Sequence, residues 1–322
     1  MNGNMVDTVD ISVVVPVRNE KKNLATIVET LVSDSPCPSR IVLVDAGSTD
    51  GTIRIERDLA GRHEVVCLIE AGGAWPGLAR NLGVGATSTK WILFVDAGVE
   101  VDSGLVQNFI EAREKRPGIR MVIGSYSCMA DTRWREAVIV ATKPSRAECH
   151  GYRGRYDFMP CLIEREFFQE LGGFRDWRAG EDLEFVSRAK SEPEAVICSP
   201  GARVVWEMAP SRRAMAKKWV TYAFHNAENG TSWHRPVLLH NSLGAVLALL
   251  MFLGIGWWCV VAPILPHLLR TLVRYRRHCG NGDDEIEGGP LVFLQALVAS
   301  VVVDAATLIG VMRWRFNRAM VQ

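Results

Sequence analysis

The sequence lacks several features that would assign it to a protein class at once. Its eight cysteines are scattered, with no CxxC pair and no clustered Cys/His spacing, which argues against a zinc site and predicts reduced thiols. The first ten residues, MNGNMVDTVD, lack the basic flank and apolar run of a signal peptide, so we expect the N-terminal part to stay in the cytoplasm. The formal net charge is only +1, so no global field favours nucleic acid as a partner.

Two common nucleotide-binding motifs are also missing. No GxGxxG fingerprint follows the first apolar run, and no GxxxxGK[ST] phosphate loop occurs in the chain. These absences exclude the usual dinucleotide and P-loop sites. A nucleotide site here has to be built from side chains and a divalent cation.

Charged residues are absent from one long stretch near the C-terminus. Between Arg235 and Arg270 there is no Asp, Glu, Lys or Arg, and residues 243–262 are almost wholly apolar. About 20 apolar residues span the ~30 Å hydrocarbon core of a bilayer. We therefore expect a transmembrane segment near residues 243–265, with a buried core helix as the alternative.

A second apolar stretch covers residues 290–312 and is interrupted only by Gln295 and Asp304. It predicts a second transmembrane segment, so the chain divides into a cytoplasmic domain (1–235) and a membrane region (236–322). Basic residues flank both sides of this region and leave its topology open, and the segment around Pro263 and Pro266 could be interfacial. Asp304 is either functional or paired with a neighbouring helix.

The first 235 residues have the pattern of an α/β domain. Short runs rich in β-branched residues at 11–15, 41–44, 65–69 and 91–95 predict buried parallel strands, and residues 21–32 have helical apolar spacing. Strand, helix and strand in alternation predict a mostly parallel sheet flanked by helices. Ligands of such sheets bind beyond the carboxyl ends of the strands.

Polar residues follow three of these predicted strands. They are Arg18 and Glu20, in the loop that begins at Pro16, after the first strand, Asp45 after the second and Asp96 after the fourth. Because these positions share one edge of the sheet, we expect their side chains to form a site. Asp50, with Ser48 and Thr49, is equally well explained as the cap of the following helix.

Five sequence blocks then carry a resemblance. VVVPVRNEKKNL, LVDAGSTDGT, GLARNLGVGAT, WILFVDAG and GGFRDWRAGEDLEFVSRAK have the order and spacing seen in glycosyltransferase family 2, whose members are inverting enzymes with the GT-A fold. The resemblance covers roughly residues 10–230. It implies a nucleoside-diphosphate sugar as donor, bound at the carboxyl edge of the sheet.

The resemblance also implies roles for single residues of the donor site. Pro16, Arg18 and Glu20 match the loop along the nucleoside, and Asp45 matches the acid that contacts base or ribose. Arg80 matches a basic residue near the nucleotide, where a guanidinium can pair with diphosphate oxygens. The alternative for Arg80 is a charge on the surface of a helix.

On the acceptor side, Asp182 matches the acid that takes the proton of the acceptor hydroxyl, and Glu181 is expected to hold its loop. Both acids would also favour a helix N-terminus through its dipole, which is the alternative. Residues 157–161 correspond to the segment that lines the acceptor side. Residues 215–219, MAKKW, resemble a degenerate QxxRW motif, so Lys218 or the pair Arg212 and Arg213 could neutralise the departing diphosphate; an alternative is contact with anionic lipid.

The family's metal motif is altered in this chain. Members usually carry Asp-x-Asp after the fourth strand, but here Asp96 is followed by Gly98, which has no side-chain ligand. Glu100 stands where related polyprenyl-phosphate sugar transferases have a further ligand, so Asp96 and Glu100 are the expected ligands of Mg²⁺ or Mn²⁺. A weak or absent metal is the alternative, and Asp102 is expected to cap a helix near residue 103.

The sequence thus predicts an inverting glycosyltransferase at the cytoplasmic face of the cell inner membrane. Its acceptor would be a lipid-linked or cell-envelope glycan, because a membrane-attached enzyme meets a substrate confined to the same surface at high effective concentration. A processive polysaccharide synthase and a non-catalytic nucleotide-sugar-binding subunit are the alternatives.

Overall fold

The computed structural model describes residues 8–143, 160–230, 264–280 and 286–321. The chain divides into two compact units. The first comprises Met1–Ser127 and Tyr152–Glu207, and the second comprises Cys128–Gly151 and Met208–Gln322. Most of the predicted membrane segment near residues 243–265 lies outside the described residues.

The first unit is built on one eight-stranded sheet with the order β3-β2-β1-β4-β7-β6-β8-β5. β2, β1 and β4 are parallel neighbours and β3 continues the parallel half, whereas β7 runs antiparallel to β4 and β6, and β5 antiparallel to β8. The strands are β1 (Thr8–Val17), β2 (Cys37–Asp45), β3 (Val66–Glu70), β4 (Trp91–Phe94), β5 (Val99–Val101), β6 (Met121–Met129), β7 (Cys161–Glu164) and β8 (Val196–Glu207).

The four strands predicted from apolar runs are the parallel half of this sheet, so the predicted α/β class is confirmed. Their side chains alternate between two faces, as a strand requires. Val13 and Val15 of β1 belong to one buried cluster, and Val14 belongs to the cluster on the other face. Both faces are apolar, which explains why the strands are continuous runs without polar alternation.

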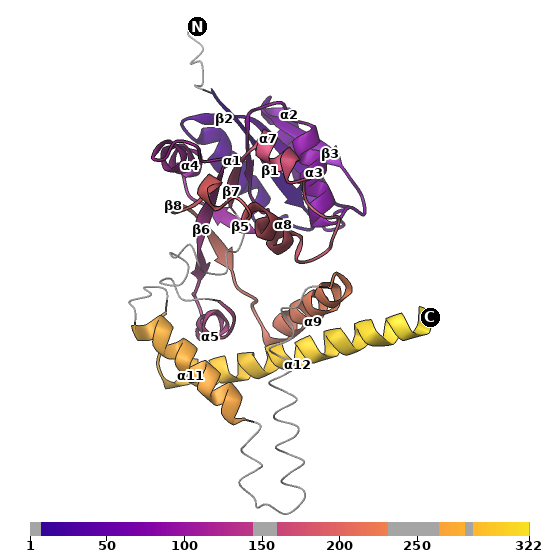
Figure 1. Cartoon of the computed structure of the whole chain (residues 1–322), viewed down its shortest axis with the longest axis vertical. Helices are drawn as coiled ribbons and strands as arrows, with labels where there is room; N and C mark the ends of the chain where they lie inside the picture. The colour runs from indigo at the N-terminus through magenta and orange to yellow at the C-terminus, as the bar shows by residue number, and fades with distance from the viewer. Residues whose placement is uncertain (1–7, 144–159, 231–263, 281–285, 322) are drawn as a thin grey trace, which may run out of the picture. The chain divides into compact units, whose positions relative to one another are not determined.

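Helices cover both faces of the sheet and make three layers (Figure 1). α1 (Leu24–Ser33) and α4 (Leu105–Glu114) pack into the cluster that holds Val13, while α7 (Arg165–Glu170) and α8 (Glu181–Ala189) pack into the cluster that holds Val14. α2 (Thr52–Arg62) follows β2, and α3 (Pro76–Gly85) contacts β1 and β2.

The expected cap of α4 is wrong. Asp102 does not precede the helix directly, because α4 begins at Leu105 after Gly104, which has φ 82°. The carboxylate of Asp34 accepts hydrogen bonds from the backbone N–H groups of Gly104 (2.5 Å) and Val106 (3.3 Å) instead. An acceptor about seventy residues away in sequence satisfies the helix start, which local capping rules do not reveal.

Beyond the end of β6, the described part of the second unit is helical. It contains α5 (Arg133–Thr142), α9 (Arg212–Glu228), α11 (Leu265–Gly280) and α12 (Pro290–Val321). Gly310 allows α12 to approach α9 closely, because a Cβ at this position would lie 2.6 Å from the carbonyl oxygen of Val220.

Asp304 of α12 pairs with α11. Arg270 donates to both carboxylate oxygens of Asp304 (3.2 and 2.8 Å), and Nδ1 of His267 lies 3.2 Å from Oδ2. The buried acid in the apolar run is therefore paired with a neighbouring helix, as one of the two sequence interpretations predicts.

Among the described residues, one helix is long and apolar enough to cross a membrane. It covers Pro290–Met320, with a mean hydropathy of 2.1 in its most apolar window, and 39% of that window is buried inside the protein.

Candidate functional site

The loops after β1 and β2 are tied together by Asn19. Its backbone lies in the left-handed region at φ 60°, its N–H donates to Ser48 Oγ (2.9 Å), and its Oδ1 accepts from the N–H of Thr49 (2.7 Å). Asn19 was not predicted as a site residue from the sequence. Its signal is the amino-acid type, because asparagine tolerates positive φ better than other non-glycine residues.

Asp45 ends β2 and is almost fully buried. Its Oδ1 accepts from the N–H groups of Gly47 (2.9 Å) and Ser48 (3.0 Å), so this carboxylate orders the loop in which it lies. Asp50 accepts from the N–H (3.0 Å) and hydroxyl (2.5 Å) of Thr52 at the start of α2, which matches its interpretation as a helix-start residue.

Glu56, on α2, lies close to Asp45. It too was not predicted as a site residue from the sequence. Its side chain is fully buried, and in its protonated form its carboxyl group donates a hydrogen bond to the Asp45 carboxylate. Burial raises the pKa of Glu56 to about 8, and the negative charge of Asp45 adds to the shift. Glu56 is therefore mostly protonated at neutral pH. An acid on the buried face of α2, in line with Thr52 and Leu59, was the available signal.

Arg80 of α3 joins two acids that are far apart in sequence. Its Nη1 donates to Glu181 Oε1 (2.7 Å) and its Nη2 to Asp96 Oδ1 (2.9 Å). The side chain is 5% exposed, so its interpretation as a surface charge is wrong. Burial alone would lower the pKa of the guanidinium, but the charges of Asp96 and Glu181 outweigh it and raise that pKa. Arg80 is a fixed cation between the end of β4 and the start of α8.

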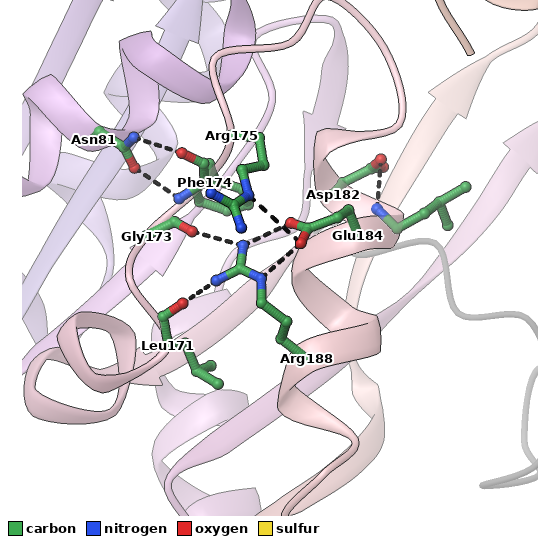
Figure 2. A network of polar contacts seen from close by, with 9 residues as sticks. Asn81, Leu171, Gly173, Phe174, Arg175, Asp182, Glu184 and Arg188 are labelled. Atoms are coloured by element: carbon green, nitrogen blue, oxygen red, sulfur yellow. Dashed lines mark hydrogen bonds and ion pairs between the residues drawn. The ribbon is translucent and has the colours of Figure 1, made fainter. Parts of the chain in front are cut away.

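Glycines in α3 place Arg80 there. A Cβ at Gly77 would lie 1.9 Å from the carbonyl oxygen of Arg175, and a Cβ at Gly83 would lie 2.4 Å from Val14. The helix can therefore approach both the sheet and the segment that leads to α8. Asn81 fixes the same segment, since its side chain donates to the carbonyl oxygen and accepts from the N–H of Phe174, each at 2.9 Å (Figure 2).

The acids at the start of α8 have different surroundings. The Glu181 side chain is only 7% exposed and accepts from Arg80, whereas Asp182 is half-buried and its Oδ1 accepts from the N–H of Leu183 at 2.8 Å (Figure 2). Arg188, nearly two turns farther along α8, pairs with Glu184 and donates to the carbonyl oxygens of Leu171 and Gly173. This network holds the segment before α8 in place, while Asp182 keeps contact with solvent.

The altered metal motif lies at the end of β4. The Asp96 side chain is 33% exposed, and Glu100 lies exposed on β5. An ideal Cβ at Gly98 would lie 3.2 Å from Glu20 Oε1, so the Glu20 carboxylate occupies the space beside Gly98. The described residues contain no group of three His, Cys, Asp or Glu side chains that converges as a complete metal site. Asp96 and one further carboxylate, together with oxygens of the substrate, would nevertheless suit Mg²⁺ or Mn²⁺, because these cations are commonly bound by one or two carboxylates and substrate phosphates.

The other predicted residues are placed as follows. Pro16 is half-buried near the end of β1 and Arg18 is exposed in the following loop. Lys218 belongs to α9 of the second unit, with its Nζ 5.5 Å from the centre of the Tyr222 ring, and its contact with diphosphate stays a prediction. Cys161 is a buried residue of β7 opposite Phe94, and residues 157–159 lie outside the described part.

Sequence comparison gives a family match. Residues 12–171 match the family described as Glycosyl transferase family 2. The uncharacterized glycosyltransferase EpsJ of Bacillus subtilis is 28% identical over 197 residues, which cover 58% of this chain and 57% of EpsJ. The uncharacterized glycosyltransferase YibD of Escherichia coli is 31% identical over 97 residues, 30% of this chain and 28% of YibD. The matched segments thus span about half or less of these relatives.

Structure comparison gives the fold. The mannosyltransferase PcManGT of Pyrobaculum calidifontis, solved in complex with GDP-Man and Mn²⁺, superposes with a TM-score of 0.53 over 96% of this chain and 87% of its own, at 16% identity. The mixed sheet with helices on both faces is the arrangement they share. The chain belongs to glycosyltransferase family 2 and carries the GT-A fold.

Proposed function

We propose that the chain transfers a sugar from a nucleoside-diphosphate sugar to an acceptor hydroxyl with inversion at the anomeric carbon. The observation that carries the proposal is the Arg80 bridge, which joins Asp96 at the end of β4 to Glu181 at the start of α8. The first position corresponds to the donor side in the family and the second to the acceptor side. Arg80 therefore fixes the separation between the two halves of the reaction.

On the donor side, the tied loops after β1 and β2 provide a rigid rim for the nucleoside. Pro16, Arg18 and Asp45 lie on this rim. Arg80 supplies a permanent positive charge beside Asp96 at the end of β4. A bound Mg²⁺ or Mn²⁺, held by Asp96 with Glu20 or Glu100, would neutralise charge on the departing diphosphate.

On the acceptor side, Asp182 is the proposed general base. A carboxylate within hydrogen-bond reach of the acceptor hydroxyl removes its proton as the bond to the anomeric carbon forms. Asp182 has the solvent contact that this role needs, whereas Glu181 is buried against Arg80 and holds the start of α8. The position of both acids in the first helical turn also stabilises negative charge.

The test is a transfer assay with the purified full-length chain. GDP-mannose is the first donor to try, because PcManGT is solved with it, followed by common UDP and dTDP sugars with Mn²⁺ or Mg²⁺. Asp182→Asn should lower the transfer rate by roughly 10²–10⁴-fold. Asp176→Asn, an equal charge change at an exposed position of the same segment, should leave it unchanged. Equal rates for both variants, or no transfer from any donor, would contradict the proposal.

We also propose that the chain is attached to a membrane and that its acceptor is a lipid-linked or cell-envelope glycan. Besides the apolar run at 243–262, α12 supports attachment. Its exposed large apolar residues lie along one face, at intervals of three or four positions except between Val301 and Ile309, where the exposed Ala305 intervenes. They are Leu291, Leu294, Val298, Val301, Ile309, Met312, Phe316 and Met320. We call this face the apolar stripe.

The opposite face of α12 is packed against α5, α9 and α11. Two of these helices, α9 and α11, carry several Arg or Lys residues, and the only acid in α11 and α12 is the buried Asp304. A helix that crossed a bilayer together with such partners would bring their charges into hydrocarbon. We therefore propose that α12 lies along the surface of an anionic membrane, with the stripe in the lipid, in place of a second crossing.

A further inference from the structure

We propose that Glu20, from the loop after β1, supplies the carboxylate that Gly98 lacks, and thus serves as a ligand of the divalent cation beside Asp96. The inference rests on the proposed function and changes the ligand set that the sequence suggests. The acid that is missing from the loop after β4 is replaced by an acid from the loop after β1. The cation itself is the one implied by the fold family.

The first support is the position of the carboxylate. A Cβ built on Gly98 would lie 3.2 Å from Glu20 Oε1 and 3.5 Å from Oε2. An aspartate at this position would place its carboxylate carbon one bond beyond that Cβ, within reach of the Glu20 carboxylate. The Glu20 carboxylate therefore places a negative charge beside position 98, where the family usually has an aspartate and this chain has glycine.

The second support is the backbone that carries the two loops. β1 and β4 are parallel neighbours with Val14 opposite Phe94, and the N–H of Val95 donates to the carbonyl oxygen of Val14 at 3.2 Å. The chain segments that follow these strands therefore leave the sheet side by side. Asp96 and Glu20 lie in those two segments.

The third support is that Glu20 is held in place by its own backbone. Its N–H donates to Thr52 Oγ1 at 3.0 Å, and the preceding Asn19 turns the chain at φ 60° while bonding to Ser48 and Thr49. A carboxylate on such a fixed backbone loses little freedom when it binds a cation. Glu100, by comparison, lies on the exposed face of β5, between the buried Val99 and Val101.

The geometry has a consequence for Gly98. With Glu20 in place, an added aspartate at position 98 would put two carboxylates in contact, and like charges at this distance disfavour each other's ionised form. Restoring the family's acid should therefore help only when Glu20 is removed. Positions 20 and 98 behave as alternatives for one carboxylate.

The experiment measures Mn²⁺ binding by electron paramagnetic resonance in the presence of GDP, and separately of UDP, so that no sugar transfer is needed. Glu20→Gln should weaken Mn²⁺ binding by about 10–100-fold, within the range seen when groups that support a metal site are altered. Gly98→Asp alone should not strengthen it. The double variant Glu20→Ala/Gly98→Asp should recover most of the Mn²⁺ binding that Glu20→Gln loses. Glu100→Gln tests the ligand that the sequence suggests and should change Mn²⁺ binding little.

Unchanged Mn²⁺ binding in Glu20→Gln, or a loss in Glu100→Gln alone, would overturn the inference. A double variant no better than Glu20→Gln would also overturn it. Thermal unfolding identifies a variant that fails to fold, and Glu20→Asp, which keeps a shorter carboxylate, then replaces Glu20→Gln and should bind Mn²⁺ more weakly than the unmodified chain. If Mn²⁺ and nucleotide bind as expected but no sugar is transferred, the ligand assignment stands and the proposed function fails.

Discussion

At the scale of single residues, Arg80 is the centre of the site. Its guanidinium is buried and donates to Asp96 and Glu181, so each acid depends on it for charge compensation. Such a pair contributes little stability compared with apolar packing, but removing one member leaves an uncompensated buried charge. The cost of losing Arg80 therefore falls mainly on Glu181, which is the more buried of the two acids.

Arg80→Met should lower the free energy of unfolding by about 3–5 kcal/mol, because Glu181 then remains buried without its cation. Adding Glu181→Gln to Arg80→Met removes that charge and should recover part of the loss. Urea unfolding of the three proteins, followed by tryptophan fluorescence, measures both effects. A double variant no more stable than Arg80→Met would contradict this account.

Glu56 gives the first unit a pH-dependent stability. Its pKa is raised from 4.5 to about 8 in the folded chain, so the folded state binds a proton that the unfolded state has released between these values. The free energy of unfolding should therefore fall as pH rises through this window. Glu56→Gln removes this contribution. The melting temperature of the variant, relative to that of the unmodified chain, should therefore rise between pH 5 and pH 9. A constant difference across this range would show that Glu56 does not titrate there.

At the scale of elements, α3 is positioned by glycines that a sequence-based helix assignment counts only as weak helix formers. Gly77 faces a backbone carbonyl and Gly83 faces β1. Helix propensity favours alanine at both positions, but the close approach excludes it. The same reasoning applies to Gly310 between α12 and α9.

Gly77→Ala should destabilise the chain by about 1–3 kcal/mol, as overpacking of a filled position does, and should reduce sugar transfer because the segment before α8 shifts. Gly85→Ala is the matched control, since nothing lies within 4 Å of its Cβ position. That variant should be neutral or slightly more stable. Thermal unfolding and the transfer assay check both variants, and equal behaviour would contradict the close-approach explanation.

At the scale of the whole molecule, the proposed membrane attachment would determine which acceptors the chain can meet. The apolar stripe runs along nearly the full length of α12, which fits a helix lying in a membrane surface. A crossing helix would place its two ends on opposite sides of the bilayer and its middle at the centre. The depth of successive stripe positions separates these arrangements.

Nitroxide labels at Leu294→Cys, Val301→Cys, Ile309→Cys and Phe316→Cys, each in a chain without its native cysteines, should report similar shallow depths in anionic vesicles. Arg315→Cys, exposed beside the stripe, should remain accessible to a water-soluble relaxation agent. Oxygen and nickel-complex relaxation measure the depth of each label. A deep maximum at Val301 with shallow values at Leu294 and Phe316 would favour a crossing helix.

The sequence by itself determined the fold class, the family and the edge of the sheet at which to look. Apolar runs long enough for buried strands, and polar residues directly after them, are local patterns that can be recognised from the sequence alone. Asp96 could be named in this way, and Glu181 could be named from the family resemblance. Arg80 could be named as a donor-site residue, but its bonds to both acids could not be predicted, because they depend on how α3 packs.

Tertiary structure decided which groups meet. The Arg80 bridge, the Asp34 cap of α4, the buried Glu56 behind Asp45 and the Glu20 carboxylate beside Gly98 all join residues separated by loops and by other strands. The physical reason is that sheet order and helix packing set these distances, whereas sequence spacing sets only contacts within one helix or strand. For the same reason the apolar run of α12 could be recognised from sequence, but only its packing showed that one face is buried around Asp304 and the other is left exposed.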